Sequence, residues 1–261
     1  FRLIIKFNTL NNNIKVEKEL TNYKLRFFTN ISHEFRTPLT LIRGAIENLN
    51  GQQDSSLNVR KQVNILSRNS AILTRLIDQL LEFRKLQNNV LTLDLEEIDI
   101  IDFAREIYGS FQEIAEQKNI TYIFTHSVES YRMYIDRRKV DKILYNLLSN
   151  AFKFTNKEGR VELVISFDEK SRVCRISVKD DGIGIEKDKQ HLLFSRFMQI
   201  NFSSSGTGVG LSLVKEFVDV HKGKIWYEDN TNRGSVFNVE LSTNADTYKG
   251  DNFVSSVPHL D

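Results

Sequence analysis

Two segments of this 261-residue chain repeat apolar residues every seven positions, and this repeat most constrains how the chain can fold. The first segment, about residues 11–49, carries the repeat at Phe28, Phe35, Ile42 and Leu49, with Ile31, Pro38 and Ala45 three places after the first three. The second carries it at Val59, Leu66, Leu73 and Leu80, with Leu76 and Phe83 beside them. Such repeats are typical of helices that pack along a seam. The intervening NGQQDSS (Asn50–Ser56) is rich in turn residues, so we predict an antiparallel helical hairpin.

The apolar stripe on each predicted helix is wider than one partner helix covers. Leu39 and Ile46 widen the first stripe, and Val63 and Ile77 widen the second. A lone hairpin would leave these side chains in water. We therefore predict a homodimer whose two hairpins form a four-helix bundle.

The pattern of apolar residues changes after about Asn88. Helical patterns cover about residues 99–118, 136–155 and a stretch that ends near 220. Alternating patterns typical of strands cover residues 120–126, 131–135, 160–167, 172–179, 224–228 and 235–241. This order predicts an α+β domain, a mixed sheet with helices on one face.

We expect four regions in the chain. Residues 1–19 would be an N-terminal linker or helix start, and residues 20–88 a dimerisation domain. Residues 89–242 would form the α+β domain, and the polar, aperiodic residues 243–261 a C-terminal linker or tail.

The composition excludes some classes of function. Lysine and arginine number 36 against 34 aspartates and glutamates, and a net charge of +2 gives no general case for nucleic-acid binding. Cys174 is the single cysteine, so we expect a core residue in a reducing compartment. No apolar run reaches the roughly 18–20 residues that cross a bilayer. The chain begins at Phe1 rather than methionine, so we expect it to be part of a longer protein.

The stretch FFTNISHEFRTPLTLI places a histidine on the helix face opposite the seam. A neutral imidazole at His33 would be a nucleophile, and the carboxylate of Glu34 could take its proton. Pro38 lies in the same helix, where it either kinks the helix or is a tolerated irregularity. A zinc-protease reading needs a second histidine where Thr37 stands, so we do not expect zinc.

Three later segments suggest a nucleotide site, although the common triphosphate and dinucleotide glycine motifs are absent. In YNLLSNAFKFT, Asn146 and Asn150 share one helix face, with Lys153 three residues further on. Amide oxygens suit Mg²⁺ and a lysine neutralises phosphate, although the same pattern fits a hydrated helix face.

The other two segments are rich in glycine. In DDGIGI, Asp180 could accept a hydrogen bond from an adenine amino group, while Gly182 and Gly184 would allow close approach of the ligand. A plain turn is the alternative. SSSGTGVGLSLVKEF (Ser203–Phe217) places glycines at a helix start, where free N–H groups favour phosphate.

These motifs carry a resemblance to a known family. SHEFRTPLTLI resembles the phosphoacceptor box of sensor histidine kinases of two-component systems. RFFTN before it is similar to hybrid sensor kinases, which carry a receiver domain further along the chain. The three nucleotide segments, in this order, resemble the ATP-binding domain of the same kinases, an α/β sandwich shared with gyrase, Hsp90 and MutL. The resemblance covers about residues 20–241.

The resemblance implies a role for each matching residue. His33 would accept the γ-phosphoryl group of ATP, Glu34 would act as base, and Thr37 would help dephosphorylate the partner. Asn146 and Asn150 would hold Mg²⁺, Lys153 would contact phosphate, and Asp180 would bind the adenine amino group. The other implied nucleotide-binding residues are Phe154, Gly182, Gly184, Gly206, Thr207, Gly208, Gly210 and Leu211.

Two features of the nucleotide segments leave questions open. The family often has asparagine or threonine where this chain has Asp181, and a second carboxylate could alter the local charge. FSRF (Phe194–Phe197) is similar to the family's aromatic box, although simple core packing is an equal alternative.

We therefore expect ATP-dependent autophosphorylation of His33, transfer to an aspartate of a response-regulator receiver domain, and possible phosphatase activity. This core would be the cytoplasmic portion of an inner-membrane sensor. A gyrase-like or Hsp90-like ATPase is one alternative, and an inactive dimerisation module is another.

Overall fold

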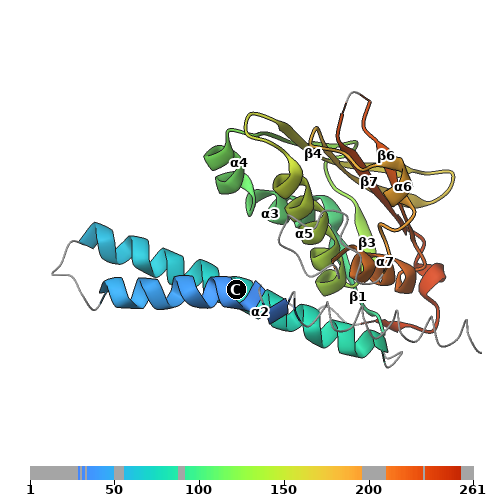
Figure 1. The fold of residues 1–261 in the computed structure, drawn as a ribbon. Coiled ribbons are helices and arrows are strands. Elements are labelled where there is room, and N and C mark those ends of the chain that lie inside the picture. Colours follow the sequence, from blue (N-terminus) through green and yellow to red (C-terminus); the bar gives the residue numbers. More distant parts are fainter. Residues whose placement is uncertain are drawn as a thin grey trace, which may run out of the picture. The chain divides into compact units, whose positions relative to one another are not determined.

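The computed structural model describes residues 29, 31–32, 34–49, 56–87, 92–195, 210–231 and 233–253. They belong to two compact units (Figure 1). One holds the helices up to Arg84, and the other holds residues 92–194 and 210–253. Among the described residues, no helix combines the length and the apolar character needed to cross a bilayer.

The first unit is the predicted helical hairpin. Its first helix is described over residues 34–49, and helical conformation continues through Pro38. Its second helix is α2 (Ser56–Gln87). Most of the predicted seam residues are withdrawn from solvent: Ile31, Pro38, Ala45 and Leu76 are buried, and Phe35, Ile42, Leu49, Leu66, Leu73 and Leu80 are half-buried. Val59, in the first turn of α2, was also predicted for the seam, but it is 41% exposed. Phe28 and the side chain of Phe83 lie outside the described residues.

A second apolar stripe remains on the hairpin surface. Its members are the four side chains that widen the predicted seams, and they are about half exposed: Leu39 53%, Ile46 45%, Val63 50% and Ile77 48%. The hairpin alone therefore leaves this stripe in contact with solvent.

The second unit is built on a five-stranded sheet. Its strands lie in the order β2 (Thr121–His126), β4 (Arg160–Asp168), β5 (Val173–Asp180), β7 (Ser235–Ser242) and β6 (Lys224–Asp229). β2 runs parallel to β4, and the other pairs are antiparallel. The sheet is thus mixed, as predicted. Cys174 on β5 is fully buried, which confirms its assignment to the core.

Helices cover one face of this sheet (Figure 1). They are α3 (Ile100–Gly109), α4 (Gln112–Lys118), α5 (Arg137–Phe154) and α7 (Gly210–Val220). The short α6 (Lys187–Gln190) lies instead near the end of β6, where Gln190 donates to Asp229 at 3.0 Å. Along β4, buried residues alternate with more exposed ones, so the strand turns one apolar face inward. α5 packs against the sheet with the seven buried residues Val140, Ile143, Leu144, Leu147, Leu148, Ala151 and Phe152. The helix predicted over residues 99–118 is two helices, because the chain turns at Gly109–Phe111, where the Ser110 amide bonds to the Ile107 carbonyl.

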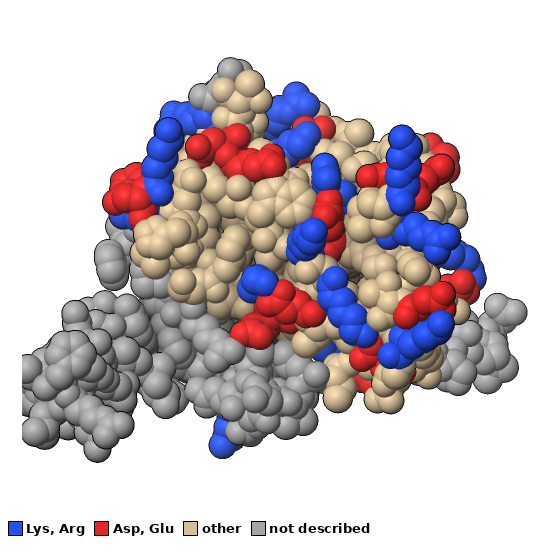
Figure 2. All heavy atoms as spheres, turned by 90° about the vertical axis from the view of Figure 1, so that its right-hand side faces the viewer, with Lys and Arg blue, Asp and Glu red and all other residues tan. Residues whose placement is uncertain are grey.

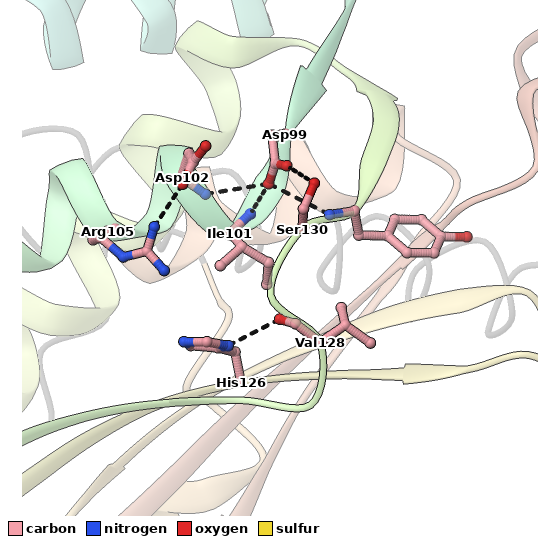
Figure 3. A network of polar contacts seen from close by, with 8 residues as sticks. Asp99, Ile101, Asp102, Arg105, His126, Val128 and Ser130 are labelled. Carbon is pink, nitrogen blue, oxygen red and sulfur yellow. Dashed lines mark hydrogen bonds and ion pairs between the residues drawn. The ribbon is translucent and has the colours of Figure 1, made fainter.

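Asp99 fixes the start of α3 and joins it to the loop before β3 (Arg132–Ile135) (Figure 3). Its Oδ1 accepts from the amides of Ile101 at 2.9 Å and Asp102 at 3.3 Å, as an N-cap does. The Ser130 hydroxyl donates to the other carboxylate oxygen. Burial acts to raise the pKa of Asp99, but these hydrogen bonds hold it below its ordinary value. The carboxylate therefore joins two segments far apart in the sequence.

The stretch after β7 is folded onto the start of the unit. It forms a 3₁₀ helix, η1 (Ala245–Tyr248), and a two-residue strand, β8 (Asn252–Phe253). β8 pairs in parallel with β1 (Asp94–Asp99), completing a small sheet in the order β3-β1-β8. Tyr248 is fully buried with Leu93 and Leu95. The polar sequence suggested a linker here because only one large side chain, Tyr248, anchors the segment.

Tyr248→Ala should destabilise the second unit by about 3–5 kcal/mol, the usual range for removing a large buried aromatic side chain. Phe253→Ala is the control, because Phe253 is 49% exposed and its loss should cost less than about 1 kcal/mol. Urea unfolding followed by the fluorescence of Trp226, the single tryptophan of the chain, reports on this unit alone. Equal losses in the two variants would contradict the anchoring role of Tyr248.

Candidate active site

α5 presents the predicted asparagines at the edge of its buried face. The helix starts at the N-cap Asp136, whose Oδ1 accepts from the Lys139 amide at 3.0 Å. Asn146 and Asn150 lie one turn apart and are half-buried. Their amides therefore lie where the core meets solvent.

Asn146 brings α5 close to the first residue of α7. Its amide nitrogen donates to the Lys142 carbonyl at 2.7 Å, so its carbonyl oxygen is the atom that faces Gly210. A Cβ added at Gly210 would lie 2.8 Å from that oxygen. A side chain at this helix start would therefore have to displace the Asn146 amide from its position.

Asp180 ends β5 and is buried, with 4% of its surface exposed. Its Oδ1 accepts from the amides of Gly182 at 2.9 Å and Ser235 at 3.2 Å. Burial raises the pKa of Asp180 to about 6, with a smaller contribution in the same direction from the charge of Asp181, while these hydrogen bonds oppose the rise. Its ionisation state therefore changes close to neutral pH.

The loop after β5 packs directly against the end of α5. A Cβ added at Gly182 would lie 2.5 Å from the Phe154 carbonyl oxygen and 2.9 Å from Asp180 Oδ1. Gly184 has a φ of +69°, in the left-handed region that favours glycine. The structure thus brings the Phe154 carbonyl, Gly182 and Asp180 together, and their assignment to one binding site stays a prediction.

Gly234 and Ser235 also belong to this cluster, and the sequence analysis missed them. Gly234 has a φ of +104°, and a Cβ there would lie 2.0 Å from the Asp180 carbonyl oxygen. Asn230 donates to the same oxygen at 2.8 Å. The only signal in the sequence was a glycine just before the last long strand, which gives no hint of its partner.

The other predicted residues fall into three groups. Lys153 is exposed, with its ammonium 5.0 Å from the centre of the Phe154 ring, and Leu211 is half-buried at the start of α7. Glu34 is half-buried and Thr37 exposed on the hairpin, which is a separate unit. His33, Gly206, Thr207 and Gly208 lie outside the described residues.

The predicted aromatic box is described only in part. The Phe194 ring packs edge-on against Phe237, with ring centres 6.4 Å apart, and Phe197 lies outside the described residues.

Comparison with known families assigns both units. Residues 23–89 match the His Kinase A (phospho-acceptor) domain. Residues 135–245 match the histidine kinase-, DNA gyrase B- and HSP90-like ATPase domain. The chain therefore belongs to the sensor histidine kinases and is a kinase core with a phosphoacceptor domain and an ATP-binding domain. The predicted family and fold are confirmed.

Individual relatives place this core within longer proteins. The chain is 37% identical over 231 residues to histidine kinase P4 of Formosa agariphila, covering 86% of this chain and 17% of that protein. It is 34% identical over 243 residues to hybrid signal transduction histidine kinase D of Dictyostelium discoideum, covering 90% and 16%. The chain thus spans about a sixth of each relative.

A solved structure is similar over most of the chain. The histidine kinase ThkA, crystallised in complex with the response regulator protein TrrA, superposes with a TM-score of 0.57 at 26% identity. The match covers 88% of this chain and 64% of that one.

Replacing Asp180 with asparagine should stabilise the ligand-free second unit at high pH. The raised pKa means that folding favours the protonated carboxyl, so its contribution is full below about pH 4 and is lost as the pH rises through about 6. Asparagine keeps an oxygen for both amide donors and never ionises. Asp180→Asn should gain roughly 2–3 kcal/mol at pH 8 and nothing at pH 4.

Unfolding in urea, followed by Trp226 fluorescence at both pH values, measures this difference. Glu169→Gln, in the exposed turn between β4 and β5, is the matched control and should change neither value. A gain of the same size at pH 4 would show that the ionisation of Asp180 is not its cause.

Proposed function

We propose that this chain uses ATP to phosphorylate His33 and then passes the phosphoryl group to an aspartate of a response-regulator receiver domain. The observation that carries the proposal is the presence of both halves of the reaction in one chain. The matched phosphoacceptor range includes His33, and the matched ATPase range includes the cluster around Asp180.

The cluster at the end of β5 would bind the adenine. Above about pH 6 the ionised Asp180 would accept a hydrogen bond from the adenine amino group. Gly182 and Gly184 would shape the loop beside the ring, because Gly182 allows close packing against the Phe154 carbonyl and Gly184 adopts a positive φ. Phe154 and Leu211 would line the same pocket. The phosphates would lie at the start of α7, an 11-residue helix whose free amides favour anions. Gly206, Thr207, Gly208 and Gly210 are the residues that we propose contact the phosphates there.

The residues of α5 fit a magnesium ion that accompanies the nucleotide. Asn146 uses its amide nitrogen within the helix, which leaves a carbonyl oxygen, the kind of ligand that Mg²⁺ prefers. Asn150, one turn further on, would supply a second oxygen, and Lys153 would contact the phosphates. When bound, the ion neutralises charge on the phosphates during transfer.

The reaction needs the nucleophile close to the phosphate. An imidazole nitrogen of His33 forms a bond to the γ-phosphorus while the bond to the bridging oxygen breaks, and ADP leaves. Glu34 accepts the proton from the imidazole. Reacting atoms must approach to about 3–3.5 Å, so the ATP-binding unit has to bring the phosphate to the hairpin. Thr37 would assist the reverse dephosphorylation of the partner.

We infer that the working form is a homodimer. The apolar stripe of Leu39, Ile46, Val63 and Ile77 is about half exposed in the hairpin, and a second hairpin would cover it in a four-helix bundle. The receiver domain would belong to a separate protein or to the same full-length chain, as the hybrid relative suggests. ATP and a free buried thiol at Cys174 fit the cytoplasmic side of an inner-membrane sensor.

Incubation of the chain with ATP labelled at the γ-phosphate should leave alkali-stable, acid-labile label on the protein. His33→Gln should abolish the label, because it removes the nucleophile. His191→Gln is the matched control, since His191 is exposed in the other unit, and it should retain the label. Release of inorganic phosphate without labelled protein would instead support an ATPase of the gyrase or Hsp90 kind.

Ile77→Glu should weaken the dimer. A carboxylate buried without a partner costs well over 1.4 kcal/mol, so the dissociation constant should rise by more than about tenfold. Sedimentation equilibrium gives the constant. Val128→Glu is the control, because Val128 is also exposed but lies in the ATP-binding unit. A dimer unaffected by Ile77→Glu would place the interface elsewhere.

A further inference from the structure

Asp181, which follows the predicted adenine-binding carboxylate, is tied to the strand beside it. Its Oδ1 accepts from the Arg160 amide at 2.8 Å, and its own amide donates to the Arg160 carbonyl at 3.2 Å. The pair continues the ladder between β4 and β5 one step past Val161 and Asp180. Asp181 thus extends the pairing of β4 and β5 by one residue, next to Asp180.

The same carboxylate packs against the turn that ends α5. A Cβ added at Gly159 would lie 2.6 Å from Asp181 Oδ1 and 2.5 Å from Thr155 Cγ2. Thr155 directly follows Phe154, whose carbonyl oxygen faces Gly182. Contacts therefore run from Asp181 through the turn of residues 155–160 to the end of α5, and back to the loop beside Asp180.

We propose that Asp181 is a positioning residue of the nucleotide site, holding the turn that ends α5 against the strand end that carries Asp180. The inference rests on the proposed role of Asp180 in adenine binding. The hydrogen bond from the Arg160 amide needs only an acceptor oxygen at position 181, which asparagine also offers. The aspartate of this chain provides that oxygen and, in addition, a negative charge.

The charge has a separate consequence for Asp180. The groups that face Asp180 are the amides of Gly182 and Ser235, the Ser235 side chain and the carboxylate of Asp181. Among the described residues, Asp181 is the one whose charge raises the pKa of Asp180, in addition to burial. Adenine binding should weaken as Asp180 becomes protonated. Because the charge of Asp181 raises the pKa of Asp180, the affinity should begin to fall at a higher pH than it would without that charge.

Two substitutions separate the hydrogen bond from the charge. Asp181→Asn keeps an acceptor for the Arg160 amide, so the affinity for Mg·ADP at pH 8 should stay within about twofold. Its loss of affinity on acidification should shift to lower pH by roughly half a unit. Asp181→Ala removes the acceptor, and the affinity at pH 8 should fall about fivefold or more.

Calorimetric titration of the full chain with Mg·ADP from pH 5 to 8.5 measures both effects, and Glu169→Gln serves as the charge-loss control. The ligand's own titration is common to all variants and cancels in the comparison. An unchanged affinity in Asp181→Ala, equal losses in the alanine and asparagine variants, or an unmoved pH profile in Asp181→Asn would overturn the proposal. Failure of the unsubstituted chain to bind, or an affinity unaffected by Asp180→Asn, would instead overturn the proposed adenine site.

Discussion

One buried residue, Asp136, joins the start of α5 to the start of β1 and to the end of α7, and the ATP-binding unit depends on this junction. It caps α5 through the Lys139 amide, forms an ion pair with the Lys139 ammonium, and accepts from the Asp94 amide at 3.1 Å. Its own amide donates to His221 at the end of α7, at 3.1 Å. Burial acts to raise the pKa of Asp136, but its hydrogen bonds and Lys139 hold the pKa below its ordinary value. The start of α5 and the end of α7 are thus fixed to each other at this point, away from the ends that would carry the proposed nucleotide site.

The contact with His221 requires a neutral imidazole. Its Nε2 accepts from the Asp136 amide, so Nδ1 carries the proton and donates to the Phe217 carbonyl at 2.6 Å. Burial lowers the pKa of His221, which keeps the ring neutral. A second proton would face the amide hydrogen of Asp136. In the sequence His221 is one of several scattered histidines, and only the fold shows that it has a structural partner.

The sequence predicted what depends on local periodicity and missed what depends on distant pairing. Seven-residue spacing was enough for the hairpin, and the asparagine helix and Asp180 followed from short motifs. β1 (DLEEID) was missed because it carries acidic residues at four of six positions and pairs only with the short strands β3 and β8. The contacts of Gly234 and Ser235 with Asp180 were missed because these residues are far from Asp180 along the chain, 55 positions away for Ser235.

The charged residues of the unit also divide into those on the surface and those whose environment only the fold reveals. Figure 2 shows lysine, arginine, aspartate and glutamate side chains interspersed on the face it presents, an arrangement that the totals of 36 basic and 34 acidic residues do not by themselves determine. The informative charges are instead the few that the fold withdraws from water, Asp136 and Asp180 above all. Asp136 has hydrogen-bond donors and an ammonium around it, which favour its ionised form. Among the described residues, Asp180 has amides, a hydroxyl and a second carboxylate around it, and burial makes its charge costly. A bound hydrogen-bond donor, such as the adenine amino group, would offset the free energy that burial of the ionised Asp180 costs. The carboxylate that lowers the folding stability of the unit at high pH would thus be the one that contributes to nucleotide affinity.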